Sequence, residues 1–192
     1  RAKVETYAMQ LSIIRAVSTG AIGGIAAFLA FGPAAPHGAQ LSALLIGWAA
    51  YHQFGGKLAG LKQSVIHLAL GAAAAALALL LATRLPLDET LGSGASIALA
   101  VAITLAALAL APKLPGFSDI PVLLLGYAAL FAAAAIGGAD KIVALAPDNP
   151  FVTTIVSLAV GAVLGLLSDI LVDALQKYLP LGRSQKQSAT SA

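Results

Sequence analysis

Two histidines, His52 and His67, lie in or beside apolar stretches of the sequence, whereas His37 lies in a connection rich in proline and glycine. Imidazole can change its charge near neutral pH, and a polar side chain at membrane depth is costly unless it is paired or faces water. With Trp48 and Tyr51 nearby, these histidines predict a polar vestibule or a proton-linked gate. A second interpretation stays open, because aromatic and imidazole rings are also common at the headgroup level of a membrane.

The second half of the chain carries matching positions. Ser157 takes the place of His67 when the two halves are aligned, and Tyr127 and Phe131 take the places of Trp48 and His52. The residues predicted to line a solute pathway are therefore Trp48, Tyr51, His52, His67, Tyr127, Phe131 and Ser157.

Asp169 is the one acid close to the interior of a predicted span. A carboxylate there fits a cation-binding or proton-relay role, and it also fits a surface position with Lys177 or Arg15 nearby. Both interpretations stay open at this point.

The composition places these residues in a membrane. The chain has 192 residues, of which 59% are hydrophobic and 10% are charged, whereas soluble domains carry about 25% charged residues. There is no cysteine, so thiol chemistry is excluded. A basic balance could indicate nucleic acid as a partner in a soluble protein, but here the cations lie between apolar runs, which makes them signals of topology.

A helix that crosses a membrane needs about 20 largely apolar residues. The sequence predicts six spans, near residues 11–31, 40–54, 64–83, 91–111, 120–138 and 151–171. The second is short, which leaves a re-entrant or broken helix open as an alternative.

The cations favour six full crossings. One side would receive nine of them (Arg1, Lys3, Arg15, Lys57, Lys62, Lys113, Lys177, Arg183 and Lys186), and the other side only Arg84 and Lys141, each accompanied by acids. By the positive-inside rule, this asymmetry predicts a multi-pass protein of a bacterial inner membrane with both termini cytoplasmic.

The chain also contains a degenerate internal repeat. Residues 43–54 match residues 122–133 at five of twelve positions, with an offset of 79 (126 − 47), and residues 65–72 match residues 155–162 at four of eight, with an offset of 90 (161 − 71). Three spans in each copy would force the copies into opposite orientations. The sequence therefore predicts an all-α, polytopic membrane protein with six transmembrane helices arranged as two inverted three-helix repeats. The expected division is an N-terminal segment 1–10, repeats 11–88 and 89–178, and a disordered cytoplasmic tail 179–192.

Motifs of common enzymes are absent from the sequence. It has no phosphate-binding loop, no H-E-x-x-H and no nucleophile elbow, so we expect no catalytic residues, no metal and no cofactor. The polar groups expected in the interior are uncharged or aromatic, which suits a small neutral or weakly polar solute better than a multivalent ion.

The stretches Gly47–Tyr51, Gly55–Lys62 and Ile120–Ala132 resemble a family of small bacterial inner-membrane proteins of unknown function, the YcdZ-like family. The resemblance covers roughly residues 15–175, and it implies no substrate. His52-Gln53 and the longer segment 140–150 depart from the family pattern. In overall shape, an inverted repeat of short apolar helices is similar to urea-transporter-type channels, which is an analogy of fold and not of function.

Three functions follow from these features. The first is a channel or permease for a small solute of the urea, amide or ammonia class, with a path between the repeats. The second is a non-transporting scaffold or accessory subunit that binds another membrane protein, and the third is an intramembrane enzyme or lipid-binding protein that uses His52 and His67. The expected partners are membrane lipid, a small solute and further copies of the chain, as a homotrimer or homodimer, with no nucleic acid.

Overall fold

The structure, a computed structural model, describes residues 2–85, 87–92, 94–138, 141–142, 146 and 149–178. Within these ranges all regular structure is helical, which confirms the all-α prediction. The predicted tail 179–192, part of segment 140–150 and its acids Asp140 and Asp148 lie outside the described residues.

Seven α-helices and two single 3₁₀ turns follow one another along the described part of the chain. They are α1 (Ala2–Phe31), η1 (Ala35–His37), α2 (Leu41–Gln53), α3 (Lys57–Ala82), α4 (Asp88–Leu91), α5 (Ala95–Ala109), η2 (Ala111–Lys113), α6 (Ile120–Gly137) and α7 (Pro150–Tyr178). Three prolines of the connections, Pro36, Pro112 and Pro121, stand at the first turns of η1, η2 and α6, where a missing N–H costs no hydrogen bond.

Five helical stretches within the described ranges are long and apolar enough to cross a membrane: Met9–Phe31, Lys57–Ala82, Ala95–Lys113, Ile120–Gly137 and Pro150–Tyr178. They correspond to five of the six predicted spans. The sixth, predicted at 40–54, is α2, which has 13 residues and is about 20 Å long. That length is short of the hydrocarbon thickness of about 30 Å.

Several boundaries differ from the prediction. Helix α1 begins at Ala2 and not at residue 11, and α7 continues to Tyr178 and not only to residue 171. Helix α3 begins at Lys57 and not at residue 64, because the two glycines before it complete the turn and residues 57–63 already belong to the helix. The span predicted from residue 91 is divided at Gly92 and Gly94, whose φ angles of 95° and 89° are incompatible with a right-handed helix. Helix α5 therefore begins at Ala95.

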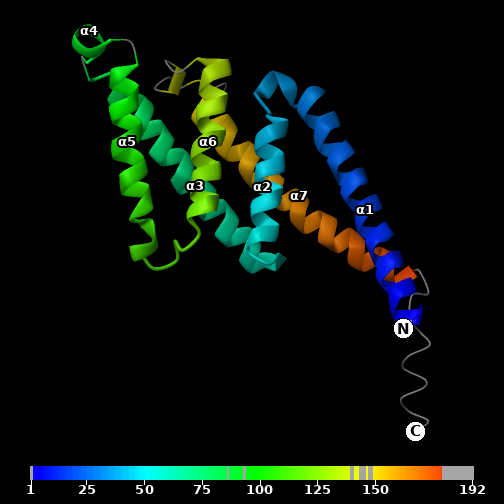
Figure 1. Cartoon of the computed structure of the whole chain (residues 1–192). Coiled ribbons are helices and arrows are strands. Elements are labelled where there is room, and N and C mark those ends of the chain that lie inside the picture. The colour runs from blue at the N-terminus through cyan, green and yellow to red at the C-terminus, as the bar shows by residue number, and fades with distance from the viewer. Residues whose placement is uncertain are drawn as a thin grey trace.

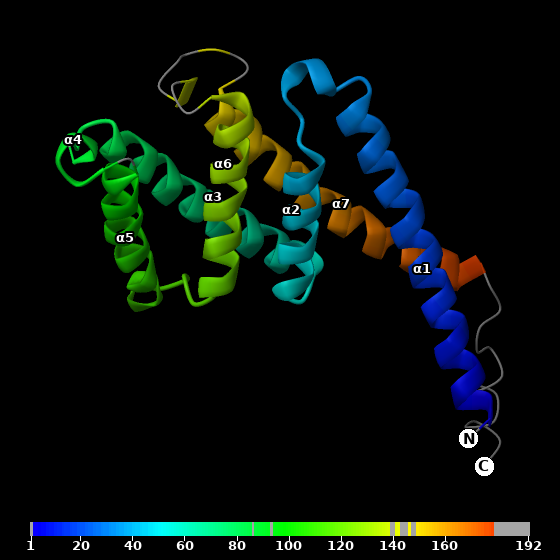
Figure 2. The same ribbon diagram turned by 45° about the horizontal axis from the view of Figure 1, so that its top comes forward.

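The helices of the two halves run in opposite directions (Figure 1). Helices α1, α3 and α6 rise from the lower end of the bundle as drawn, whereas α2, α5 and α7 descend. Helices α3 and α7 are strongly inclined and pass behind α6 and α2, an arrangement that the second view repeats (Figure 2). The start of α1 and the end of α7 lie at the same end of the molecule.

Glycines mark the two closest helix crossings. A Cβ on Gly47 of α2 would lie 2.9 Å from the carbonyl carbon of Leu158, and one on Gly161 of α7 would lie 2.7 Å from that of Leu44. Helices α3 and α6 meet in the same way, because Gly71 faces the backbone of Leu123, and Gly126 faces that of Leu68. Small residues at crossings let helix backbones approach closely in lipid.

The two crossings are related residue by residue. With the offset of 79 residues, Gly47 and Leu44 match Gly126 and Leu123. With the offset of 90 residues, Gly71 and Leu68 match Gly161 and Leu158. Each contact of the α2–α7 crossing therefore has its counterpart in the α3–α6 crossing.

Between these crossings lies a buried apolar cluster, which we call the central cluster. Its members are Ala43, Ala50, Leu68, Val122, Ala129 and Leu158, none of which is more than 5% exposed. These side chains fill the space between the four crossing helices.

Candidate functional site

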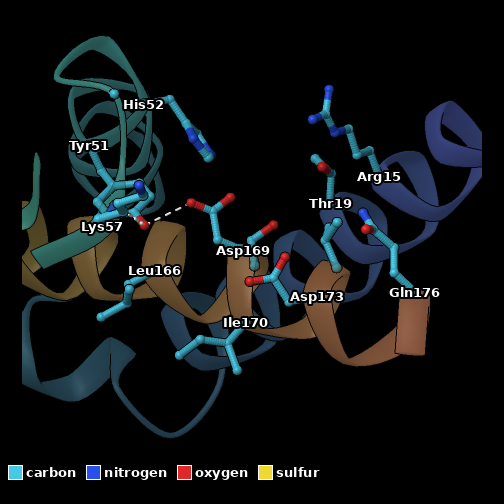
Figure 3. Close-up of a pocket in the computed structure, with 13 residues that line it drawn as sticks. Arg15, Thr19, Tyr51, His52, Lys57, Leu166, Asp169, Ile170, Asp173 and Gln176 are labelled. Carbon is cyan, nitrogen blue, oxygen red and sulfur yellow. Dashed lines mark hydrogen bonds between the residues drawn. The ribbon is translucent and has the colours of Figure 1, made fainter. Parts of the chain in front are cut away.

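A cavity of about 590 Å³ opens between α1, α2, α7 and the turn that joins α2 to α3 (Figure 3). Its wall combines acids, bases and hydroxyls with apolar side chains: Arg15, Thr19, Tyr51, His52, Gly55, Lys57, Leu166, Ser168, Asp169, Ile170, Val172, Asp173 and Gln176. We call it the Asp169 cavity.

Tyr51 connects three elements at the floor of this cavity. Its ring is fully buried, and its hydroxyl donates a hydrogen bond of 2.8 Å to Oδ2 of Asp169 on α7. The same hydroxyl oxygen accepts the backbone N–H of Lys57, also at 2.8 Å. Lys57 has a φ of 59°, a conformation that is rare for a residue with a side chain. The tyrosine therefore joins the end of α2 and the start of α3 to α7.

His52 lies beside Tyr51 but is exposed to the cavity. Trp48, one turn earlier, donates its indole N–H to Nε2 of His52 at 2.9 Å. Since that nitrogen accepts, a neutral ring carries its hydrogen on Nδ1. The Tyr51 and His52 rings also meet edge to face, with centroids 5.0 Å apart. The group predicted from the sequence at this end of α2 is thus assembled.

The opposite walls of the cavity carry different charges. Asp169, Asp173 and Gln176 extend from α7, and Arg15 and Thr19 extend from α1 across open space (Figure 3). Asp169 is half-buried, whereas Asp173 and Arg15 are exposed. No ion pair forms among the described residues that line this cavity, so carboxylate and guanidinium groups both stay open to a bound molecule.

His67 does not line the Asp169 cavity and lies in a separate buried site on α3. Its imidazole is fully buried, and Nδ1 lies 2.8 Å from the carbonyl oxygen of Gln63 one turn earlier on α3. The rings of Phe54 and Phe117 lie against it, with centroid distances of 4.6 and 5.3 Å. The sequence allowed His52 and His67 to face each other across the α2–α3 loop; the structure instead places one in the cavity and the other between phenyl rings.

Ser157 belongs to a third group, at the end of the bundle where α2 begins. Its hydroxyl accepts the backbone N–H of Gln40 at 3.3 Å, and the Gln40 amide donates to the hydroxyls of Thr153 and Thr154 at 3.4 and 3.3 Å. A cavity of about 290 Å³ adjoins Gln40 and Thr153.

The aromatic pair of the second half is packed into the core. Tyr127 and Phe131 stack with centroids 5.1 Å apart, and the Tyr127 hydroxyl lies 2.9 Å from Oγ1 of Thr104 on α5. The predicted pathway residues therefore lie in four separate groups. Of these residues, Tyr51 and His52 line the Asp169 cavity, and Trp48 is hydrogen-bonded to His52.

The sequence does not predict the partners of several residues. Phe54 and Phe117 cover His67, and Gln40 joins Ser157, and nothing in their local sequence marks these contacts. The sequence singles out Asp169, but it does not identify Tyr51 as its hydrogen-bond partner, because the two residues are 118 positions apart. The expected proximity of Arg15 to Asp169 agrees with the cavity lining, although the two side chains form no ion pair.

Tyr51 and Asp169 both match leucines at the equivalent positions of the other half, so a polar side chain is not needed for packing at these positions. The offset of 79 converts Tyr51 into Leu130, and the offset of 90 converts Leu79 into Asp169. Leu130 is as fully buried as Tyr51. In the second half, the apolar Leu130 stands at the position of Tyr51. In the first half, the apolar Leu79 stands at the position of Asp169.

Among the described residues, no group of three or more histidine or acidic side chains could hold a metal ion.

The fold and these sites define a polytopic helical protein of the membrane. The chain belongs to the family described as protein of unknown function DUF1097, which it matches over residues 16–173. This range agrees closely with the extent of the family resemblance seen in the sequence. No curated protein and no solved structure matches the chain.

Proposed function

We propose that this protein is a permease or channel for a small neutral or weakly polar solute of the urea, amide or ammonia class. The Asp169 cavity would receive the solute at one end of the bundle, and the group around Gln40 and Ser157 would contact it at the other. In this proposal the residues bind and orient the solute and carry out no chemical reaction on it.

The proposed architecture is a pair of inverted three-helix repeats, α1–α3 and α5–α7, with α2 as a short sixth crossing. Three observations support it: the reciprocal glycine contacts, the opposite directions of the matched helices in Figure 1, and the offsets that relate both. Inverted repeats commonly place the solute site at the interface between the copies.

The observation that carries the proposal is the polarity of the Asp169 cavity. A scaffold could use leucine at these positions, as the chain does at the matched residues Leu79 and Leu130. The charges on the cavity walls instead provide donors and acceptors that can replace part of the hydration of a small polar solute.

The central cluster closes the path between the two ends. Transport therefore requires the α2–α7 pair to move against the α3–α6 pair, and each pair holds one helix of either repeat.

Flux into proteoliposomes tests this function. Vesicles with purified protein should take up urea, formamide, ammonia or glycerol faster than empty vesicles, and Asp169→Asn should reduce that flux by about tenfold, the loss expected for one strong hydrogen bond. The asparagine keeps an acceptor for Tyr51, and Glu89→Gln on α4 provides a charge-removing control far from the cavity. Absence of flux for all solutes would disprove the proposal.

The tight central cluster favours one alternative, a non-transporting scaffold or accessory subunit. Its partner would be another membrane protein bound on the exposed helix faces. A stable partner that co-purifies with wild type and with Asp169→Asn alike, together with zero flux, would support this function. A bacterial inner-membrane location, cytoplasmic termini and a homotrimer or homodimer remain predictions.

A further inference from the structure

The buried imidazole of His67 has an unsatisfied nitrogen. Nδ1 faces the Gln63 carbonyl oxygen, which can only accept, so Nδ1 carries the hydrogen. Nε2 of the neutral ring then presents a lone pair, and it has no hydrogen-bond partner among the described residues although the side chain is fully buried. Leaving a buried acceptor unpaired costs free energy, so the arrangement indicates a ligand that donates an N–H or O–H group.

Two phenyl rings cover this imidazole. Phe54 follows α2 and Phe117 precedes α6, and their rings are tilted by 49° and 50° to the His67 ring. Both phenylalanines are partly exposed, whereas His67 is not. A small molecule would therefore reach Nε2 by displacing one of the rings, and once bound it would lie against their faces.

The neighbouring groups are electron-rich. Asp119 is two residues from Phe117 and caps α6, accepting the backbone N–H of Val122 at 3.1 Å. Its other carboxylate oxygen accepts the side-chain amide of Gln53 at 3.2 Å. The faces of aromatic rings carry negative potential. The nearest cations along the chain, Lys57 and Lys62 on α3 and Lys113 in η2, are exposed.

We propose that His67, Phe54 and Phe117 form a recognition site for a small protonated amine, of the ammonium or methylammonium type. One N–H would donate to Nε2 of His67, and the positive charge would lie against the phenyl faces through cation–π attraction. Urea, amides and glycerol fit less well, because their oxygen needs a donor that the described contacts around His67 do not supply. This inference rests on the proposed function, and it replaces the neutral solute by the protonated form of the ammonia class.

The second half provides a matched variant. Ser157 takes the position of His67, is buried, and is satisfied by the backbone N–H of Gln40. A serine is therefore accommodated at this helix crossing, and we expect His67→Ser to fold while it removes the ring nitrogen. His37→Ala, in η1, is the control.

Imidazole ¹⁵N NMR tests binding directly, because the chain holds only three histidines. In nanodiscs, ammonium chloride or methylammonium chloride should shift the Nε2 resonance of His67 saturably, whereas urea and potassium chloride should not. His67→Ser should remove that resonance and weaken methylammonium binding by about tenfold, as expected for one charge-assisted hydrogen bond. An unshifted resonance, or an equal shift with potassium chloride or urea, would overturn the assignment.

Uptake of ¹⁴C-methylammonium and of urea into proteoliposomes separates this inference from the proposed function. Saturable binding without any uptake would refute transport and leave the amine site intact. Urea uptake that is unaffected by His67→Ser, with an unshifted Nε2 resonance, would refute the amine site and leave transport intact.

Discussion

Among single residues, Tyr51 has the most demanding position. Its hydroxyl satisfies a backbone N–H in a strained turn and a carboxylate on a distant helix at the same time. The sequence identifies Tyr51, Trp48 and His52 as a group because they lie within five residues of one another on one predicted helix. It cannot identify Asp169 as their partner, because a contact across 118 positions is set by helix packing and not by local pattern.

We therefore expect Tyr51→Phe to destabilise the protein by about 1–3 kcal/mol, since it leaves a donor and a carboxylate without their partner. Tyr127→Phe should cost less, because the one hydrogen of the Thr104 hydroxyl still has the carbonyl oxygens of Ala100 and Val101 as acceptors within its own helix. Thermal unfolding in detergent measures both. Equal losses for the two variants would show that the Tyr51 contacts contribute nothing beyond one ordinary hydrogen bond.

Among the helices, the crossing glycines determine which elements touch. The internal repeat in the sequence singles out Gly47, Gly126, Gly71 and Gly161. The pattern does not predict which helices these glycines bring together. In the structure α2 crosses α7 and α3 crosses α6, so each crossing joins a helix of one half to a helix of the other. The sequence pattern also does not predict the break between α4 and α5. The apolar residues continue on both sides of Gly92 and Gly94, but the positive φ angles of these glycines interrupt the helix.

Gly47→Ala and Gly126→Ala should each destabilise the fold by about 1–3 kcal/mol or more, because the added methyl group would overlap the backbone of the partner helix. Gly24→Ala on α1 has no described neighbour within 4 Å of the new Cβ, and it should be neutral or stabilising by up to about 1 kcal/mol through helix propensity. Monodispersity on size exclusion and the thermal midpoint test this comparison. Tolerance of both crossing variants would contradict the close contact.

For the molecule as a whole, composition is enough to predict an all-helical membrane protein, and five of the predicted spans correspond to long apolar helices. Hydropathy does not settle the short α2, because 13 residues are compatible with a thinned crossing or a re-entrant segment. Its direction in Figure 1, opposite to that of α6, supports the inverted arrangement.

Cysteine labelling tests the arrangement, since the sequence has no cysteine. Ala35→Cys lies in η1 between α1 and α2, and Ser118→Cys lies between α5 and α6; both positions are exposed. An impermeant maleimide should label them from opposite sides of the membrane, whereas Gly55→Cys should react from the same side as Ser118→Cys. Labelling of Ala35→Cys and Ser118→Cys from one side would rule out inverted repeats.

The crossing of helices between halves has a consequence for biosynthesis. A ribosome completes α2 and α3 well before α6 and α7, so the glycine faces of the early helices enter the bilayer with nothing to pack against. Tyr51 likewise has no partner until Asp169 has been translated, 118 residues later. These crossings therefore cannot be completed helix by helix during insertion, and they form only after α7 has left the translation machinery.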